Sequence, residues 1–172
     1  LFSRSAYSRG RIGAEGVQPE RYDESTRMPF RGVRTNSVVF EEQAIDFSQS
    51  RRAPRVPGVQ DTASQFVQLT YLFTSRPELA NAGQRIEFPL AFPRGLRGYA
   101  YQVKGRELLQ TPVGPLDTLH VVPRRLQPVN NDLVAQAWFA PAYRYFPVRI
   151  RLTLGEENYV DLLISKPPEV AD

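Results

Sequence analysis

The stretch Asp61–Ser75, DTASQFVQLTYLFTS, is a long segment without proline or glycine, and it predicts the principal α-helix of the chain. Asp61 is suited to the N-cap, because its carboxylate can accept hydrogen bonds from the free N–H groups of the first turn. The apolar residues predict a helix buried against a sheet. On one helical face they are Ala63, Phe66, Val67 and Tyr71, together with Thr70, and Leu69, Leu72 and Phe73 widen this face.

Most other segments alternate between apolar and polar residues, which is typical of β-strands. The pattern predicts two hairpins. In one, Gly98–Val103 and Arg106–Thr111 flank a tight turn at Lys104-Gly105, because glycine tolerates the positive φ of such turns. In the other, Pro147–Leu154 is followed by Tyr159–Ser165. Further strands are predicted at Arg34–Glu42, Ala44–Gln49 and Gln84–Phe92.

One long helix cannot supply the crossovers that a parallel sheet needs. We therefore predict a mostly β fold, in which a strongly curved antiparallel sheet (a β-roll or half-barrel) packs around the helix at about residues 61–75. The length of 172 residues suits a single β-rich domain over residues 1–172. Leu1–Tyr7 already resembles a strand and does not begin with methionine, so we expect N-terminal strands of the native protein to be missing.

The composition narrows the classes of function. The absence of cysteine excludes disulfides, thiolate catalysis and thiolate metal sites, and no common metal or phosphate motif is present. We expect no cofactor. The net charge is +4, but the arginines are scattered, so we do not expect nucleic-acid binding. Because no stretch approaches the ~20 apolar residues of a membrane span, we expect membrane contact only through an anchor ahead of Leu1.

His120, the only histidine, lies in Leu116–Val122 on the strand face of Thr118. A structural histidine is the simpler interpretation, and a general base beside Asp61 or Glu107 is the alternative. Trp138, Tyr143 and Tyr145 lie in the aromatic stretch Ala137–Val148. Their rings suit either packing or a surface that is apolar on one side and wet on the other. We predict a ligand-binding site at Trp138, Tyr143, Tyr145 and His120, and no catalytic residue.

Three stretches together resemble an uncharacterised family of bacterial cell-envelope proteins, domain of unknown function thirty-one-oh-eight. The similarity lies in Gly58–Leu69, Gly105–His120 and Trp138–Arg151, and extends to Gly13–Arg27. The matching motif residues are Gly58, Gln60 and Asp61; Gly105, Glu107, Thr111, Pro112 and Gly114; and Trp138, Pro147, Val148 and Arg149. The resemblance implies a curled antiparallel sheet and a location in the periplasm or cell envelope of a Gram-negative bacterium. It implies no activity.

These observations favour a non-enzymatic envelope module that binds an apolar ligand or a partner protein. The alternative is a hydrolase or isomerase that uses His120 with a nearby carboxylate. The sequence specifies neither the ligand, the oligomeric state nor the pathway.

Overall fold

The computed structural model describes residues 3–28, 30, 32–125, 134–154 and 158–169. Two compact units make up the chain. The first comprises residues 1–68 and 88–98, and the second comprises residues 69–87 and 99–172. The boundary between them falls within one helix and two strands, so we describe the elements in chain order and the packing of each unit by itself.

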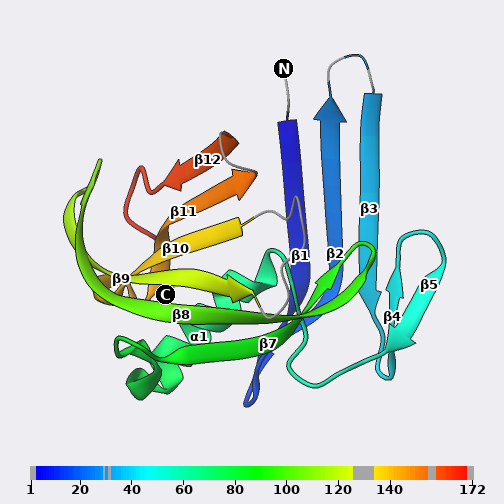
Figure 1. Ribbon diagram of the computed structural model, residues 1–172, viewed down its shortest axis with the longest axis horizontal. Helices are drawn as coiled ribbons and strands as arrows, with labels where there is room; N and C mark the ends of the chain where they lie inside the picture. The colour runs from blue at the N-terminus through cyan, green and yellow to red at the C-terminus, as the bar shows by residue number, and fades with distance from the viewer. Residues whose placement is uncertain (1–2, 29, 31, 126–133, 155–157, 170–172) are drawn as a thin grey trace. The chain divides into compact units, whose positions relative to one another are not determined.

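A five-stranded antiparallel sheet occupies the first unit, in the order β1-β2-β3-β4-β5 (Figure 1). Its strands are β1 (Ser3–Gly13), β2 (Gly16–Met28), β3 (Gly32–Phe40), β4 (Ala44–Phe47) and β5 (Arg51–Pro54). Alternate side chains of β2 to β4 point into a core, as the period-two pattern predicts. That core contains Tyr22, Val38, Phe40, Ile45 and Phe47, with Val59 and Ala91. The backbone of Arg51–Pro54 pairs with β4, which makes β5 the edge strand of this sheet.

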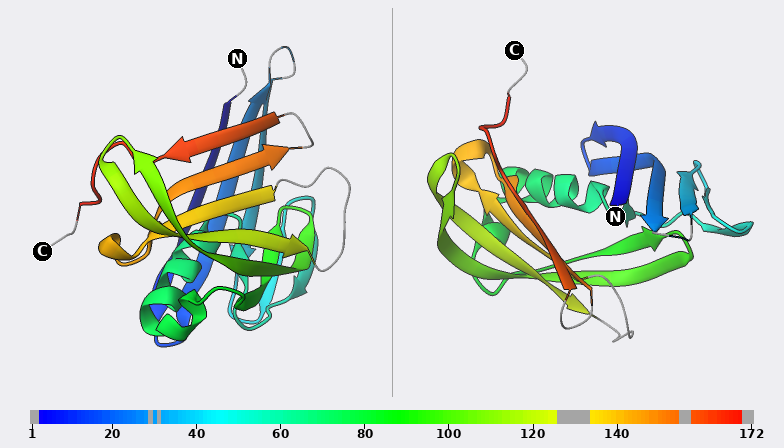
Figure 2. Two further views of the ribbon diagram at one scale, coloured as in Figure 1. Left: turned by 60° about the vertical axis from the view of Figure 1, so that its left-hand side comes forward. Right: turned by 90° about the horizontal axis from the view of Figure 1, so that it is seen from above.

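The second sheet has seven strands in the order β12-β11-β10-β9-β8-β7-β6 and is strongly curled. The strands are β6 (Gln60–Asp61), β7 (Arg85–Phe92), β8 (Gly95–Thr111), β9 (Gly114–Arg125), β10 (Val134–Ala140), β11 (Phe146–Leu154) and β12 (Asn158–Leu163). The strands from β8 to β12 pair antiparallel with their neighbours, whereas the two-residue β6 pairs in parallel with β7. Figure 2 shows β10, β11 and β12 side by side. The prediction of a mostly β fold with a half-barrel sheet is therefore confirmed.

The predicted turn at Lys104-Gly105 is wrong. Residues 95–111 form one continuous strand, and the hairpin turn to β9 lies between Thr111 and Gly114. At Gly105 the pairing register with β9 shifts, and its φ is +129°. Gly105 thus forms a β-bulge, because an extra residue in one strand needs a backbone conformation that glycine adopts without strain.

Helix α1 (Ser64–Ser75) begins three residues later than predicted. Asp61 nevertheless caps it, since its Oδ1 accepts hydrogen bonds from the N–H groups of Ala63 (2.9 Å) and Ser64 (2.8 Å). The Ser64 hydroxyl in turn accepts the Asp61 N–H at 2.9 Å, which completes a reciprocal cap. A short 3₁₀ turn, η1 (Pro77–Ala80), follows the helix.

The buried face of α1 differs from the predicted one. Leu69, Leu72 and Phe73 are buried, whereas Val67 is 47% exposed and Phe66 is half-buried. In the second unit, the Phe73 ring meets the Phe139 ring edge-on at 5.3 Å between centroids. The C-terminal part of the helix therefore packs on the sheet through Phe73. The buried face is rotated away from the predicted face, which was centred on Phe66 and Val67. In the described part of the chain, no helix has the length and apolar character to span a membrane.

Candidate functional site

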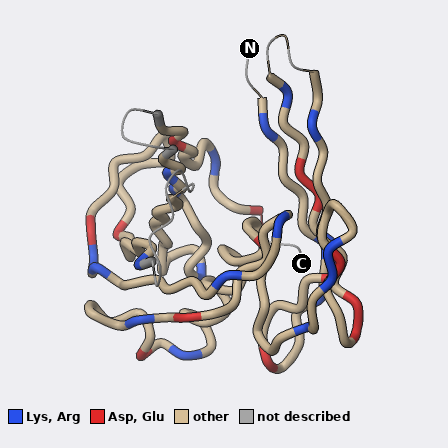
Figure 3. The backbone as a smooth tube through the Cα atoms, turned by 45° about the vertical axis from the view of Figure 1, so that its right-hand side comes forward, with Lys and Arg blue, Asp and Glu red and all other residues tan. Residues whose placement is uncertain are grey.

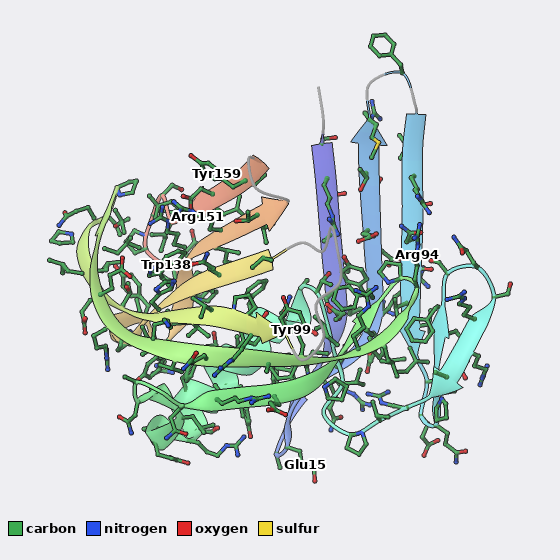
Figure 4. All side chains as sticks on the ribbon, in the orientation of Figure 1. Glu15, Arg94, Tyr99, Trp138, Arg151 and Tyr159 are labelled. Atoms are coloured by element: carbon green, nitrogen blue, oxygen red, sulfur yellow. The ribbon has the colours of Figure 1, made fainter. Side chains whose placement is uncertain are left out.

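One face of the second unit carries a row of polar and aromatic side chains that crosses neighbouring strands. The register places His120 of β9 opposite Trp138 of β10, and Trp138 opposite Arg149 of β11. Because Phe139 contacts the helix, its neighbour Trp138 points to the opposite face of the sheet. We call this set the cross-strand row (Figure 4 labels three of its members); it comprises Glu107, His120, Trp138, Arg149, Asp161, Arg151 and Tyr159.

Trp138 lies at the centre of the row and is 4% exposed. The His120 ring is stacked on its indole, with centroids 4.3 Å apart and an interplanar angle of 4°. The guanidinium of Arg149 lies 4.7 Å from the indole centroid, within the range of a cation–π interaction. The indole N–H donates to Glu107 Oε2 at 3.1 Å. Most of the indole surface is therefore in contact with protein groups.

His120 is held by two further side chains. Its Nδ1 lies 3.5 Å from Glu107 Oε2, and its Nε2 lies 3.1 Å from Gln136 Oε1. The His120 side chain is 20% exposed. The structure thus brings the histidine beside one of the two carboxylates considered from the sequence. The other, Asp61, caps α1 in the first unit and accepts a hydrogen bond from the Ser8 hydroxyl at 2.6 Å.

The β12 end of the row is a charged cluster around one carboxylate. Asp161 accepts two hydrogen bonds from Arg149 (2.8 and 2.6 Å), and Arg151 Nη2 donates to it at 2.7 Å. The hydrogen bond from Arg149 is the largest influence on Asp161 and lowers its pKa to about 2, with Arg151 contributing in the same direction. The same bond raises the pKa of Arg149. Arg151 also lies 5.2 Å from the Tyr159 ring centroid.

The four predicted site residues do not all meet. Tyr143, in the 3₁₀ turn η2 (Pro141–Tyr143), packs against the apolar cluster that includes Trp138. Tyr145 instead faces the helix, with its ring 5.6 Å from Phe73 and its carbonyl accepting from Thr70 at 2.8 Å. Trp138 and His120 are therefore direct neighbours, Tyr143 packs against the cluster to which Trp138 belongs, and Tyr145 contacts the helix instead. Their role in ligand binding stays a prediction.

A second polar cluster, in the first unit, joins the β1–β2 hairpin to the start of α1. Gln68 Oε1 accepts the Val17 N–H at 2.8 Å, and Gln60 Nε2 donates to the Val17 carbonyl at 2.8 Å. Both glutamines are buried. Gly16 has φ +108°, and a Cβ there would lie 2.6 Å from Gln68 Oε1, so the close approach requires glycine. Gln60 of the Gly58–Asp61 motif thus holds the β1–β2 hairpin against the segment that leads into α1.

Two open grooves lie in the first unit. One, of about 570 Å³, runs over the outer face of β1–β3 and is lined mainly by hydroxyl and charged side chains, including Ser5, Tyr7, Arg21 and Asp23. The other, of about 850 Å³, has a mixed lining that includes Arg11, Glu20, Phe40 and Arg55. Neither contains a residue of the cross-strand row. Among the described residues there is no group of three or more His, Asp and Glu side chains placed to hold a metal ion.

Comparison with known families gives a match over residues 2–159 to the family described as "Protein of unknown function (DUF3108)". The chain belongs to this family. The resemblance noted from the sequence is thereby confirmed at the level of the family. In this DUF3108 chain, Trp138 contacts Glu107 from another stretch of that resemblance and Arg149 from its own. No curated protein and no solved structure matches the chain.

Sequence reasoning did not find the links to Asp161. Arg149 and Arg151 lie on one face of β11, as the alternation of a strand requires. The missing information was the register of β11 against β12, which pairs Arg151 with Asp161. A single acidic residue at the centre of the apolar strand Tyr159–Leu163 was the available signal.

Proposed function

We propose that this chain is a non-enzymatic module of the Gram-negative cell envelope that binds a partner protein by adding a strand to the edge of β12. The envelope location rests on the resemblance given above. The mode of binding rests on one observation, the apolar and exposed character of β12. Strand addition uses main-chain hydrogen bonds for affinity and alternate side chains for specificity.

β12 is the last strand of its sheet and pairs with β11 alone in the described sheet. Four of its side chains are large, apolar and exposed: Tyr159 (65%), Val160 (49%), Leu162 (53%) and Leu163 (42%). Val160 and Leu162 share a face, opposite Leu152 and Ile150 of β11. An added strand would find unpaired backbone groups at this edge and apolar side chains on both faces.

The edge strand β1 of the five-stranded sheet has a different character. β1 carries Arg4, Arg9 and Arg11, and its pairing with β2 is interrupted by a register shift between Arg9 and Gly10. Charged side chains and bulges are common devices that prevent unwanted pairing at an edge strand. β12 carries a single charged residue, Asp161, against the three arginines of β1, and its pairing with β11 shows no register shift. This contrast supports β12 as a recognition edge.

A partner protein is favoured over an apolar ligand by the character of the two grooves. Both are open, and charged or hydroxyl side chains contribute much of their lining. Small apolar ligands bind instead in concave sites that cover most of their surface with apolar side chains.

The proposal is tested by photo-crosslinking in the native host. A benzophenone amino acid at Val160 or Leu162 should give a discrete adduct with another polypeptide, and the same probe at Tyr7 of β1, which is 64% exposed, should not. Leu162→Lys should remove the adduct formed from position 160, while circular dichroism and thermal unfolding remain those of the parent. Equal adducts from positions 160 and 7, or an adduct that survives Leu162→Lys, would contradict strand addition.

A hydrolase or isomerase is the second candidate, and the 3.5 Å contact between His120 Nδ1 and Glu107 Oε2 favours it. A carboxylate beside a histidine can orient it as a general base. Both ring nitrogens, however, face side-chain oxygens, and one ring face is covered by Trp138. Turnover of ester substrates by the purified protein that is abolished by His120→Gln and reduced by Glu107→Gln would establish this candidate.

A further inference from the structure

The turn between β2 and β3 carries an apolar tip with a basic surround. Phe30 has a fully exposed side chain (108%), and Met28 and Val33 are 43% and 54% exposed. Full exposure of a phenylalanine is costly in water, since burial of such a large apolar side chain is favourable. Phe30 also has a positive φ of 63°. Single exposed apolar residues are common on protein surfaces. Three of them at the end of one hairpin instead indicate a site that interacts with another apolar surface.

The charges around the tip are all of one sign. Residues 25–40 contain three arginines and no aspartate or glutamate. Figure 3 shows the same contrast along the tube, with basic segments toward this end of the sheet and acidic segments farther from it. Within the described residues, neither Arg27 nor Arg34 forms an ion pair, and both are exposed. The acidic residue closest in sequence before the turn, Glu24, already accepts from Arg4, Tyr22 and Asn36.

The register sets the arginines behind the apolar tip and on both faces of the hairpin. Arg27 pairs with Val33, and Arg34 pairs with Thr26, so alternation directs the two guanidinium groups to opposite faces. At ~3.3 Å per residue, Arg27 lies at most about 10 Å behind Phe30. Interfacial protein segments bury their apolar side chains about 5–10 Å into the headgroup and acyl boundary. Arginines set back by that depth would lie at the level of the lipid phosphates.

We infer that the β2–β3 tip, formed by Met28, Phe30 and Val33 with Arg27 and Arg34, docks onto an anionic lipid bilayer. This membrane contact is independent of the β12 edge. The apolar side chains enter the boundary region, and the arginines attract anionic headgroups, an interaction that weakens as salt rises. An apolar tip without acidic residues is suited to such a surface.

The absence of cysteine allows a single-site reporter. Phe30→Cys, labelled with the environment-sensitive dye NBD, should show a blue shift and brighter emission when vesicles of phosphatidylglycerol and phosphatidylcholine are added. The same label at Ile12 is the matched control, because Ile12 is 65% exposed near the turn of the β1–β2 hairpin. Ile12→Cys should show no change. Vesicles of phosphatidylcholine alone should give a much smaller response at position 30.

Vesicle co-sedimentation of unlabelled protein gives the second measurement. Phe30→Ser should weaken binding by about tenfold, Arg27→Gln with Arg34→Gln should remove the preference for anionic vesicles, and Ile12→Ser should bind like the parent. A silent label at position 30, equal binding to neutral vesicles, or equal losses for Phe30→Ser and Ile12→Ser would overturn the inference. Because β12 is unchanged in all these variants, the result does not depend on the proposed function.

Discussion

The imidazole of His120 and the indole of Trp138 are stacked almost in parallel, with an interplanar angle of 4°. They come from adjacent strands, and the register makes them direct cross-strand neighbours. The guanidinium of Arg149 lies 4.7 Å from the indole centroid. The Trp138 indole therefore contacts one side chain from each adjacent strand, His120 from β9 and Arg149 from β11. Such cross-strand pairs each contribute roughly 0.2–1 kcal/mol to sheet stability.

Trp138→Phe should therefore destabilise the protein by about 1–2 kcal/mol, since it removes the hydrogen bond to Glu107 and weakens the cation–π contact. Urea unfolding followed by circular dichroism measures the loss, because the variant has no tryptophan for fluorescence. Leu108→Ala, at a 66% exposed position of the same sheet, is the control and should change stability by less than about 0.5 kcal/mol. Equal unfolding free energies of Trp138→Phe and the parent would show that the contacts of Trp138 with Glu107 and Arg149 do not stabilise the protein.

Asp161 should make the protein sensitive to acid. Its folded pKa of about 2 lies below the ordinary value of about 3.9, so the carboxylate stabilises the folded state above about pH 4. This contribution is lost as the pH falls from about 4 to about 2. Urea midpoints measured across that range should fall less steeply in Asp161→Asn than in the parent. Asp117→Asn, which removes an exposed ion pair with Arg106, should keep the parent's slope.

Tyr22 should give a dependence at alkaline pH. Burial is the main cause that raises its pKa to about 12, above the ordinary value of about 10. The neutral phenol is fully stabilising below about pH 10, and its contribution is lost between about pH 10 and 12. Tyr22→Phe should have a shallower loss of stability over this range. A residual loss is expected, because burial also raises the pKa of Tyr101.

Asp61→Ala should cost more than an ordinary helix cap. A cap alone contributes ~1 kcal/mol, but buried Asp61 also accepts from Ser8, and a buried donor left without a partner costs about 1–3 kcal/mol more. We expect a loss of about 2–4 kcal/mol in chemical denaturation. Ser8→Ala removes the bond to Asp61 but leaves the cap intact, so it should destabilise the protein less than Asp61→Ala. A loss of ~1 kcal/mol for Asp61→Ala would mean that the bond to Ser8 contributes little.

Phe73→Ala should destabilise the protein by about 3–5 kcal/mol, because Phe73 is fully buried against Phe139 and Tyr145. Val67→Ala is the matched helix control and should change stability little, since Val67 is 47% exposed. Thermal unfolding of the two variants distinguishes the observed helix face from the face first expected. Comparable losses in both variants would support the original assignment.

The sequence was informative wherever a local pattern determines structure. The alternation of Ile86, Phe88 and Leu90 predicts a strand with a buried face, and these residues are buried in β7. Asp61 predicts a helix cap because the cap is formed within three residues. Gly105 was misread because a bulge and a turn require the same backbone freedom, and only the pairing partner distinguishes them.

The cross-strand row could be predicted only in part. The sequence singled out Trp138 and His120 by residue type, and it named Glu107 as a carboxylate that could meet the histidine. Contacts among them depend on the register of β8, β9 and β10, which is a long-range property. The burial of the indole, the separation of Tyr145 and the links from Arg149 and Arg151 to Asp161 all follow from that register.

The double contact of Gln60 and Gln68 with the Val17 peptide has a consequence for the order of folding. The β1–β2 hairpin joins residues close in sequence, whereas the bonds to Val17 span 43 and 51 residues. Closing these longer loops costs more conformational entropy than closing the hairpin, so we expect the bonds to Val17 to form after the hairpin. The Val17 amide then reports the final docking step, and its hydrogen exchange should follow opening of that contact while the hairpin remains intact.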